Sequence, residues 1–177
     1  MSDQIEARSI EDLLYALDEC FDGEGAEGGV FLNEDEPGLF AMLNALDAER
    51  ASEPTAGASV ANHVCHLIFA IDVFVRRIGG KIGEKSDRPS VPPRPFALNE
   101  NADPFDVDWK MSWRERPVDA AGWEALKKDL ADRRRDAESL AREHGARHPR
   151  LVSALLTHTV FHLGIIRVKF DVLTDSN

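Results

Sequence analysis

Residues 59–78 read SVANHVCHLIFAIDVFVRRI, and this stretch decides the fold class. Its apolar residues recur every four and three positions, a spacing that places their side chains on one face of an α-helix. A second apolar flank predicts that the helix is buried on more than one side. The next pair, Gly79-Gly80, is typical of a helix C-terminus. The main apolar seam consists of Val60, Val64, Leu67, Ile71, Phe74 and Ile78.

Helical periodicity recurs on both sides of this stretch. We expect a helix over Ser9–Phe21, with Ser9 as its N-cap, and a short helical piece over Gly38–Asp47. A long helix is predicted over Asp119–His144, whose first residue is a favourable N-cap. The last helix is predicted over Pro149–Leu173, with proline at the favoured first position. No segment has a convincing strand pattern, so the predicted class is all-α.

Two connections interrupt the helical pattern. Residues 51–58 form a predicted loop, and Lys81–Val118 form a long crossover that holds six of the nine prolines. Neighbouring helices in bundles are usually joined by about 2–8 residues. The crossover is much longer, so we expect it to cross the body and join two parallel helices. Its Trp109 and Trp113 predict that it packs against the body, and residues 1–177 are expected to form one domain.

Charge and composition exclude several classes of function. Lys plus Arg is 21 and Asp plus Glu is 32, which gives a net charge of −11. Such a surface repels phosphate backbones and anionic lipids, so neither nucleic acid nor a membrane is an expected partner. No uninterrupted apolar run approaches the roughly 18 residues of a membrane span, and a cytoplasmic location is expected. The cysteines, Cys20 and Cys65, are predicted to be free thiols.

A pair of histidines lies near the centre of the apolar stripe predicted for the last helix. His158 and His162 are four residues apart, so their rings lie one helical turn apart on the same face. This spacing can supply two metal ligands, although the motif HTVFH lacks the glutamate of a metalloprotease HExxH. The alternative is two hydrogen-bonded core histidines. The apolar residues of this predicted stripe are Leu151, Leu155, Ile165, Ile166, Val172 and Leu173.

A third metal ligand must come from another helix. His63 and His66 are the candidates, and helical periodicity alone mildly favours His63. We interpret His144 and His148 as solvated or capping residues. Cys65 points about 100° away from His66, so we interpret it as an apolar filler and not as a ligand.

Four motifs occur in an order that resembles the DinB-like (YfiT-like) superfamily of bacterial proteins. They are FDGEGAEGGVFLNEDEPGLF over residues 21–40, SVANHVCHLIFAIDVF over 59–74, DWKMSW over 108–113 and LLTHTVFHLGIIR over 155–167. The resemblance implies an up-down-down-up four-helix bundle with a long crossover between its second and third helices. It also implies a divalent metal held by His66, His158 and His162. Here His66 is favoured because it stands directly before a leucine.

The chain departs from the family pattern at two positions. Phe161 stands where many relatives have tyrosine, and Val168 where many have glutamine. If that glutamine contacts substrate in relatives, the activity of this chain differs from theirs.

Three protein ligands leave open positions on a metal, which is the arrangement of a catalytic or substrate-binding site. Because some relatives activate a low-molecular-weight thiol, the leading hypothesis is a metal-dependent thiol S-transferase that uses Zn²⁺, Ni²⁺ or Fe²⁺. The alternatives are a non-catalytic metal- or small-ligand-binding protein of stress response, and a degenerate bundle used for protein contacts. The presence of all three histidines argues against the last. A homodimer is left open.

No residue is assigned as a general base. Asp72 lies on a different helix face from His66, and Asp108 and Ser112 reach the site only if the crossover folds over it. Finally, because histidines must be neutral to bind metal, we expect metal-conferred stability to be lost in acid. We also expect the metal-free protein to be less sensitive to pH near 6.

Overall fold

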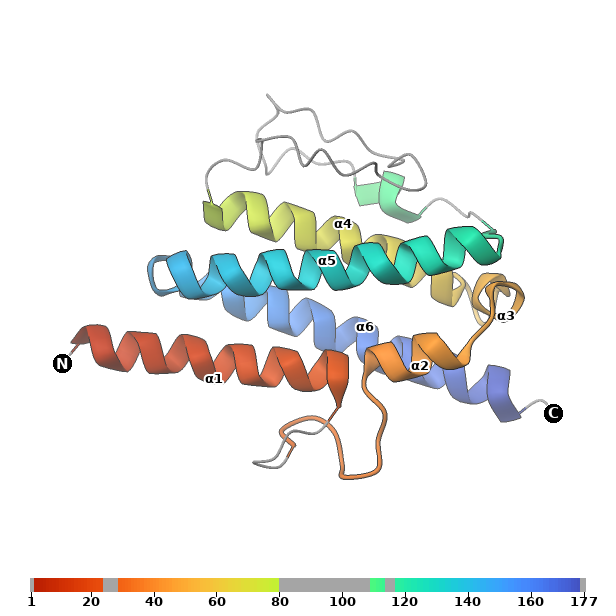
Figure 1. Ribbon diagram of the computed structural model, residues 1–177, viewed down its shortest axis with the longest axis horizontal. Helices are drawn as coiled ribbons and strands as arrows, with labels where there is room; N and C mark the ends of the chain where they lie inside the picture. Colours follow the sequence, from red (N-terminus) through yellow and green to blue (C-terminus); the bar gives the residue numbers. More distant parts are fainter. Residues whose placement is uncertain (1, 24–28, 80–108, 114–116, 176–177) are drawn as a thin grey trace.

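The computed structural model describes residues 2–23, 29–79, 109–113 and 117–175. These residues are helical or irregular, and no strand occurs among them, which confirms the all-α class (Figure 1). The α-helices are α1 (Ser2–Asp22), α2 (Leu39–Ala45), α3 (Ala48–Ser52), α4 (Val60–Gly79), α5 (Ala120–His144) and α6 (Pro149–Asp175). Two short 3₁₀ helices are η1 (Trp109–Trp113) and η2 (Gly145–Arg147).

The ends of α5 and α6 follow local sequence signals. Asp119 is the N-cap of α5, and its side chain accepts a hydrogen bond from the Gly122 amide at 2.7 Å. Gly145 is the C-cap of the same helix. Pro149 begins α6, where its missing N–H costs nothing because the first amides of a helix have no partner within it. The predicted boundaries at these three residues are confirmed.

Two predicted helices differ from the structure at their ends. The start of α1 lies well before Ser9, which is therefore inside the helix and is not its N-cap. The piece predicted over Gly38–Asp47 ends earlier than expected, at Ala45, because the backbone becomes extended at Leu46. Asp47 then caps α3 by accepting a hydrogen bond, at 2.8 Å, from the amide three residues later. Thus α3 occupies part of the loop predicted over residues 51–58.

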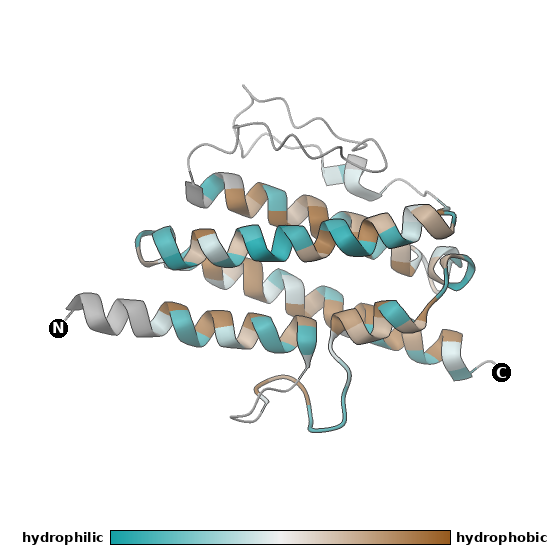
Figure 2. Cartoon of the chain, in the orientation of Figure 1, coloured by the Kyte–Doolittle hydropathy of each residue, from teal (hydrophilic) through white to brown (hydrophobic). Residues whose placement is uncertain are grey.

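The four long helices lie side by side (Figure 1). In this view α1 and α6 run from left to right, whereas α4 and α5 run from right to left. Helix α4 packs against both α5 and α6, and α1 packs against the same two helices. The viewer-facing side of α5 is largely hydrophilic, whereas α4 is largely hydrophobic (Figure 2). Helix α4 is therefore the central element on which the site is built.

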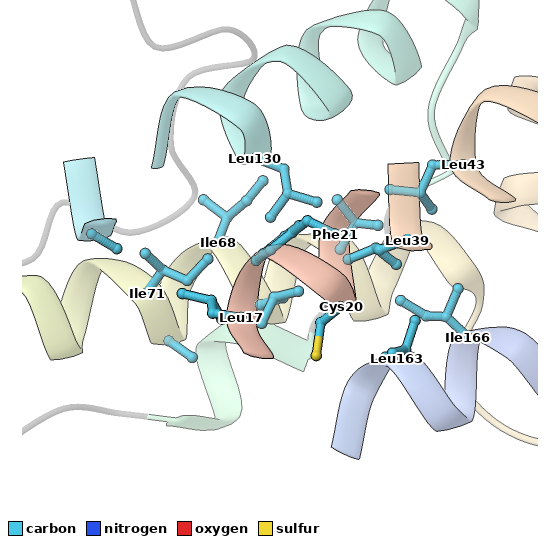
Figure 3. Close-up of a cluster of buried hydrophobic side chains, with 14 of the residues drawn as sticks. Leu17, Cys20, Phe21, Leu39, Leu43, Ile68, Ile71, Leu130, Leu163 and Ile166 are labelled. Atoms are coloured by element: carbon cyan, nitrogen blue, oxygen red, sulfur yellow. The ribbon is translucent and has the colours of Figure 1, made fainter. Parts of the chain in front are cut away.

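The apolar core collects side chains from all four long helices and from α2 (Figure 3). Full burial of one Leu, Ile or Phe side chain contributes about 1.5–3 kcal/mol, so this cluster holds α1 firmly against α5 and α6, and α5 against α4. The residues labelled in Figure 3 are Leu17, Cys20, Phe21, Leu39, Leu43, Ile68, Ile71, Leu130, Leu163 and Ile166.

The buried face of α6 is narrower than the predicted stripe. Leu155, Ile166 and Leu173 are buried as expected, but Val172 is 52% exposed. Val172 lies about 100° around the helix from Leu173, at the edge of the face. The buried face also includes Lys169, whose ammonium group donates to the Thr55 carbonyl oxygen and which the apolar pattern did not predict.

Among the described helices, α6 alone is long and apolar enough to cross a bilayer by length and composition. Its apolar residues do not form an uninterrupted run, because serine, threonine and histidine stand among them, but its mean hydropathy is high. This is weak evidence for a membrane span, since the buried core helix of a soluble protein passes the same test.

Candidate metal centre

Three histidines predicted from the sequence lie together between α4 and α6. Each of His66, His158 and His162 offers one ring nitrogen, and these three atoms lie within 4.8 Å of one another. The ring centroids of His158 and His162 are 4.6 Å apart, as expected for successive turns of one helix. His66 reaches both from α4, with centroid distances of 5.2 and 4.9 Å. The three side chains are therefore close enough to hold one metal ion.

Burial keeps these imidazoles neutral. Burial, together with the charge of neighbouring histidines, lowers the pKa of His162 to about 3 and the pKa of His66 to about 4. Burial also lowers the pKa of His158. A neutral imidazole has a lone pair on one ring nitrogen, which is the form that binds a metal.

One ring nitrogen in this group has no hydrogen-bond partner. The Nε2 atom of His158 is buried, and no polar atom among the described residues bonds to it. A buried polar atom without a partner costs about 1–3 kcal/mol. A metal ion bound at Nε2 would remove that cost, so the donor set fits a metal.

His66 uses its other nitrogen for a contact with η1. Its Nδ1 lies 2.6 Å from Ser112 Oγ, and the Ser112 hydroxyl donates to the Trp109 carbonyl oxygen at 2.6 Å. Ser112 is 1% exposed, so this contact is shielded from water. The Nε2 atom of His66 is the nitrogen left for the centre. Ser112 therefore does reach the site, and Asp108 lies outside the described residues.

His63 is not a member of the close group. It is buried, and its Nδ1 lies 3.1 Å from Nδ1 of His162. Burial and the charge of Lys169 lower the pKa of His63 to about 4. Helical periodicity favoured His63 as the third ligand and the family resemblance favoured His66. The structure groups His66, and not His63, with His158 and His162.

The two crossover tryptophans in η1 pack against the body of the protein, as predicted, and both contact this group. Trp113 is 36% exposed, but one face of its ring stacks on His66 with centroids 4.0 Å apart and planes at 19°. Trp109 is partly buried against the core and makes an edge contact with Phe69 at 5.3 Å. Together the two indoles cover one side of the centre.

The other candidates named from the sequence lie away from the group. His144 is at the end of α5 beside Glu143, 3.3 Å away, and His148 precedes α6. Asp72 is buried and pairs with Arg133 of α5 at 3.2 Å. Cys20 and Cys65 are free thiols, as predicted, and Cys65 packs at the edge of the apolar core.

The pKa values correct one expectation about acid sensitivity. We expected the metal-free protein to respond little to pH near 6. However, the imidazoles of His63, His66 and His162 have pKa values of about 3–4 in the fold without any metal. An unfolded histidine titrates near 6.5, so the folded protein binds fewer protons below that pH. The metal-free protein should therefore lose stability as the pH falls below about 6.5.

Comparison with protein-family models, with curated proteins and with solved structures finds no match for this chain. The function must therefore be inferred from the centre itself. Its features are three converging imidazoles, one buried nitrogen without a partner among the described residues, and two indoles that cover one side.

Proposed function

We propose that this chain binds one divalent metal ion through Nε2 of His66, His158 and His162. The observation that carries the proposal is the unpaired, buried Nε2 of His158 within a group of three converging ring nitrogens. Neutral imidazoles suit Zn²⁺, Ni²⁺ and Fe²⁺. We also propose that the chain belongs to the DinB-like superfamily, because four of its sequence motifs resemble those of that superfamily.

The proposed fold is the up-down-down-up four-helix bundle of that superfamily. The directions of the four long helices in Figure 1 support it, because α1 and α6 run opposite to α4 and α5. In that arrangement the histidines of α4 and α6 come from neighbouring antiparallel helices.

The proposed activity is that of a metal-dependent thiol S-transferase. Three protein ligands leave at least one coordination position open, as in catalytic sites. When bound there, a divalent ion would lower the pKa of a low-molecular-weight thiol and make it a better nucleophile. The residues of this chain hold the ligand set, and the indoles of Trp109 and Trp113 exclude water from one side of it.

The second candidate is a metal- or small-ligand-binding protein without catalysis. One observation favours it: among the described residues, the side chains that form hydrogen bonds to these imidazoles are Ser112 and His63, and both are engaged in those bonds. Neither is therefore available as a general base while those bonds persist.

Two measurements test these proposals in order. Metal analysis of the purified protein should give one divalent ion per chain, and protein that takes up no metal would end both proposals. The metal-loaded protein is then incubated with low-molecular-weight thiols and a generic electrophile, with metal-free protein as the control. Metal-dependent thioether formation supports the transferase, whereas metal binding without turnover supports the second candidate.

A further inference from the structure

Two of the three proposed ligands have their second ring nitrogen held by a neighbouring side chain. Nδ1 of His66 meets Ser112 Oγ at 2.6 Å, and Nδ1 of His162 meets Nδ1 of His63 at 3.1 Å. A histidine can bind a metal through Nε2 only when its proton is on Nδ1. The hydrogen-bond partners of the two Nδ1 atoms therefore decide whether Nε2 of His66 and Nε2 of His162 each offer a lone pair to the metal.

The direction of the Ser112 contact follows from counting protons. A serine hydroxyl has one hydrogen, and that of Ser112 donates to the Trp109 carbonyl oxygen at 2.6 Å. Ser112 can then only accept from His66. The His66 proton must be on Nδ1, and its Nε2 has a free lone pair.

The contact between His63 and His162 has two possible directions. If His63 donated, the proton of a neutral His162 would be on Nε2, which would then offer no lone pair to a metal. If His162 donates, its Nε2 is free and His63 keeps its own proton on Nε2. Only the second direction is compatible with metal binding at His162 Nε2.

We propose that His63 and Ser112 are positioning residues, which hold His162 and His66 in the tautomer that presents Nε2 to the metal. This inference rests on the proposed function. Groups that hold a metal-bound histidine in this way typically change metal affinity about 10–100-fold when they are removed. The partner of a metal-bound histidine is usually a carboxylate, a backbone carbonyl or water, whereas here it is a hydroxyl and a second imidazole.

The tautomers can be measured directly in the metal-free protein. Long-range ¹H–¹⁵N spectra of ¹⁵N-histidine-labelled protein at pH 7.5 separate Nδ1–H from Nε2–H imidazoles. His66 and His162 should be Nδ1–H, and His63 should be Nε2–H, with signals assigned by single substitution. A proton on Nε2 of His162 or of His66 would overturn the proposal, whatever the protein binds.

Affinity for Zn²⁺, measured by chelator competition, tests the same roles independently. His63→Leu and Ser112→Ala should each weaken binding about 10–100-fold. His63→Asn should stay close to wild type, because the amide oxygen can occupy the place of Nδ1 as an acceptor. His144→Leu is the matched control, since it removes a histidine far from the centre.

The outcomes separate this inference from the proposed function. Wild-type protein that binds no Zn²⁺ contradicts the metal site itself. Wild-type binding with equally tight binding by His63→Leu contradicts only the positioning role of His63. Equal losses in His63→Leu and His63→Asn, with equally lowered melting temperatures of the metal-free proteins, would show that His63 is needed for packing alone and would overturn its proposed role.

Discussion

Two buried polar clusters in this protein differ in how completely their atoms are paired. After α1 the chain turns back, and the carboxylate of Glu19, 2% exposed, accepts hydrogen bonds from three amides. These are the amides of Val30, Phe31 and Leu32, at 2.8, 2.7 and 2.6 Å. Between α4 and α6, by contrast, Nε2 of His158 is buried without a partner among the described residues.

The difference indicates two different roles. A buried carboxylate with several donors fixes the local backbone, and nothing further is needed to satisfy it. Gly29 is part of the same arrangement, because a Cβ there would collide with the Leu32 carbonyl oxygen. A buried ring nitrogen without a partner costs free energy by itself and is suited to a ligand. We therefore expect substitutions at the first cluster to change stability and those at the second to change metal binding.

The largest expected effect is the loss of metal from His158→Ala or His162→Ala. Two remaining imidazoles hold a divalent ion weakly, so metal analysis should show near-complete loss in each variant. The metal-free proteins should still fold, because the helix seams do not depend on the metal. Full retention of metal in both variants would mean that the centre is not a metal site.

A smaller contrast is expected between the two histidines of α4. His66→Ala should abolish metal binding, whereas His63→Ala should weaken it less, because only His66 lies in the close group. Titration with Zn²⁺ in the presence of a competing chelator measures both. The reverse order would show that His63 is the ligand.

Removal of the Glu19 carboxylate should change stability and leave metal binding intact. Glu19→Ala leaves three amides without their acceptor, and we expect a loss of about 3 kcal/mol in the free energy of unfolding. Denaturant titration measures this, and Asp35→Ala is the control because Asp35 is an exposed acid in the same segment. The contrast between the two clusters would be contradicted if Glu19→Ala unfolded at the same denaturant concentration as the wild type, or if the variant no longer bound metal at the histidines.

As the pH falls, the metal-free protein should lose stability at a higher pH than that at which the metal-loaded protein loses its metal. Burial lowers the pKa of His162 to about 3 and of His63 and His66 to about 4. Stability from these neutral imidazoles is complete above about pH 6.5 and is lost as the pH falls toward 4. Each histidine that titrates only in the unfolded state lowers the free energy of unfolding by about 1.4 kcal/mol per pH unit.

Melting curves measured with metal and with chelator at several pH values can test this difference. Between pH 7.5 and about 5 the folded imidazoles of His66 and His162 bind few protons, so their contribution to the stabilisation conferred by metal should stay nearly constant. It should shrink only as the pH approaches 4. A metal effect that disappears already between pH 7 and 6 would show that the histidines are not buried and neutral.

The smallest effect concerns the two tryptophans of η1. In a Trp123→Phe background, emission from Trp109 and Trp113 should shift to the red and become easier to quench on unfolding. Trp109 is partly buried and Trp113 stacks on His66, which limits access of water and quencher. Emission that is already red-shifted and does not change on unfolding would contradict this packing.

Much of the architecture could be predicted from local patterns. The uninterrupted seam of 59–78 predicts α4, and Asp119, Gly145 and Pro149 predict helix ends, because these signals depend on a few neighbouring residues. Local patterns failed where two signals compete. The helical piece predicted to reach Asp47 ends at Ala45, and Asp47 instead caps the next helix. Val172 lies on the exposed edge of the predicted apolar stripe.

Some features of the metal centre are likewise determined by local sequence, and others by tertiary structure. A four-residue spacing on one helix places His158 beside His162, and the sequence alone determines that. The choice between His63 and His66 depends on how α4 is rotated against α6, which hydrophobic packing over the whole molecule decides. The contact between Ser112 and His66 joins residues 46 positions apart. It exists only because η1 packs back onto α4, and no local pattern contains that information.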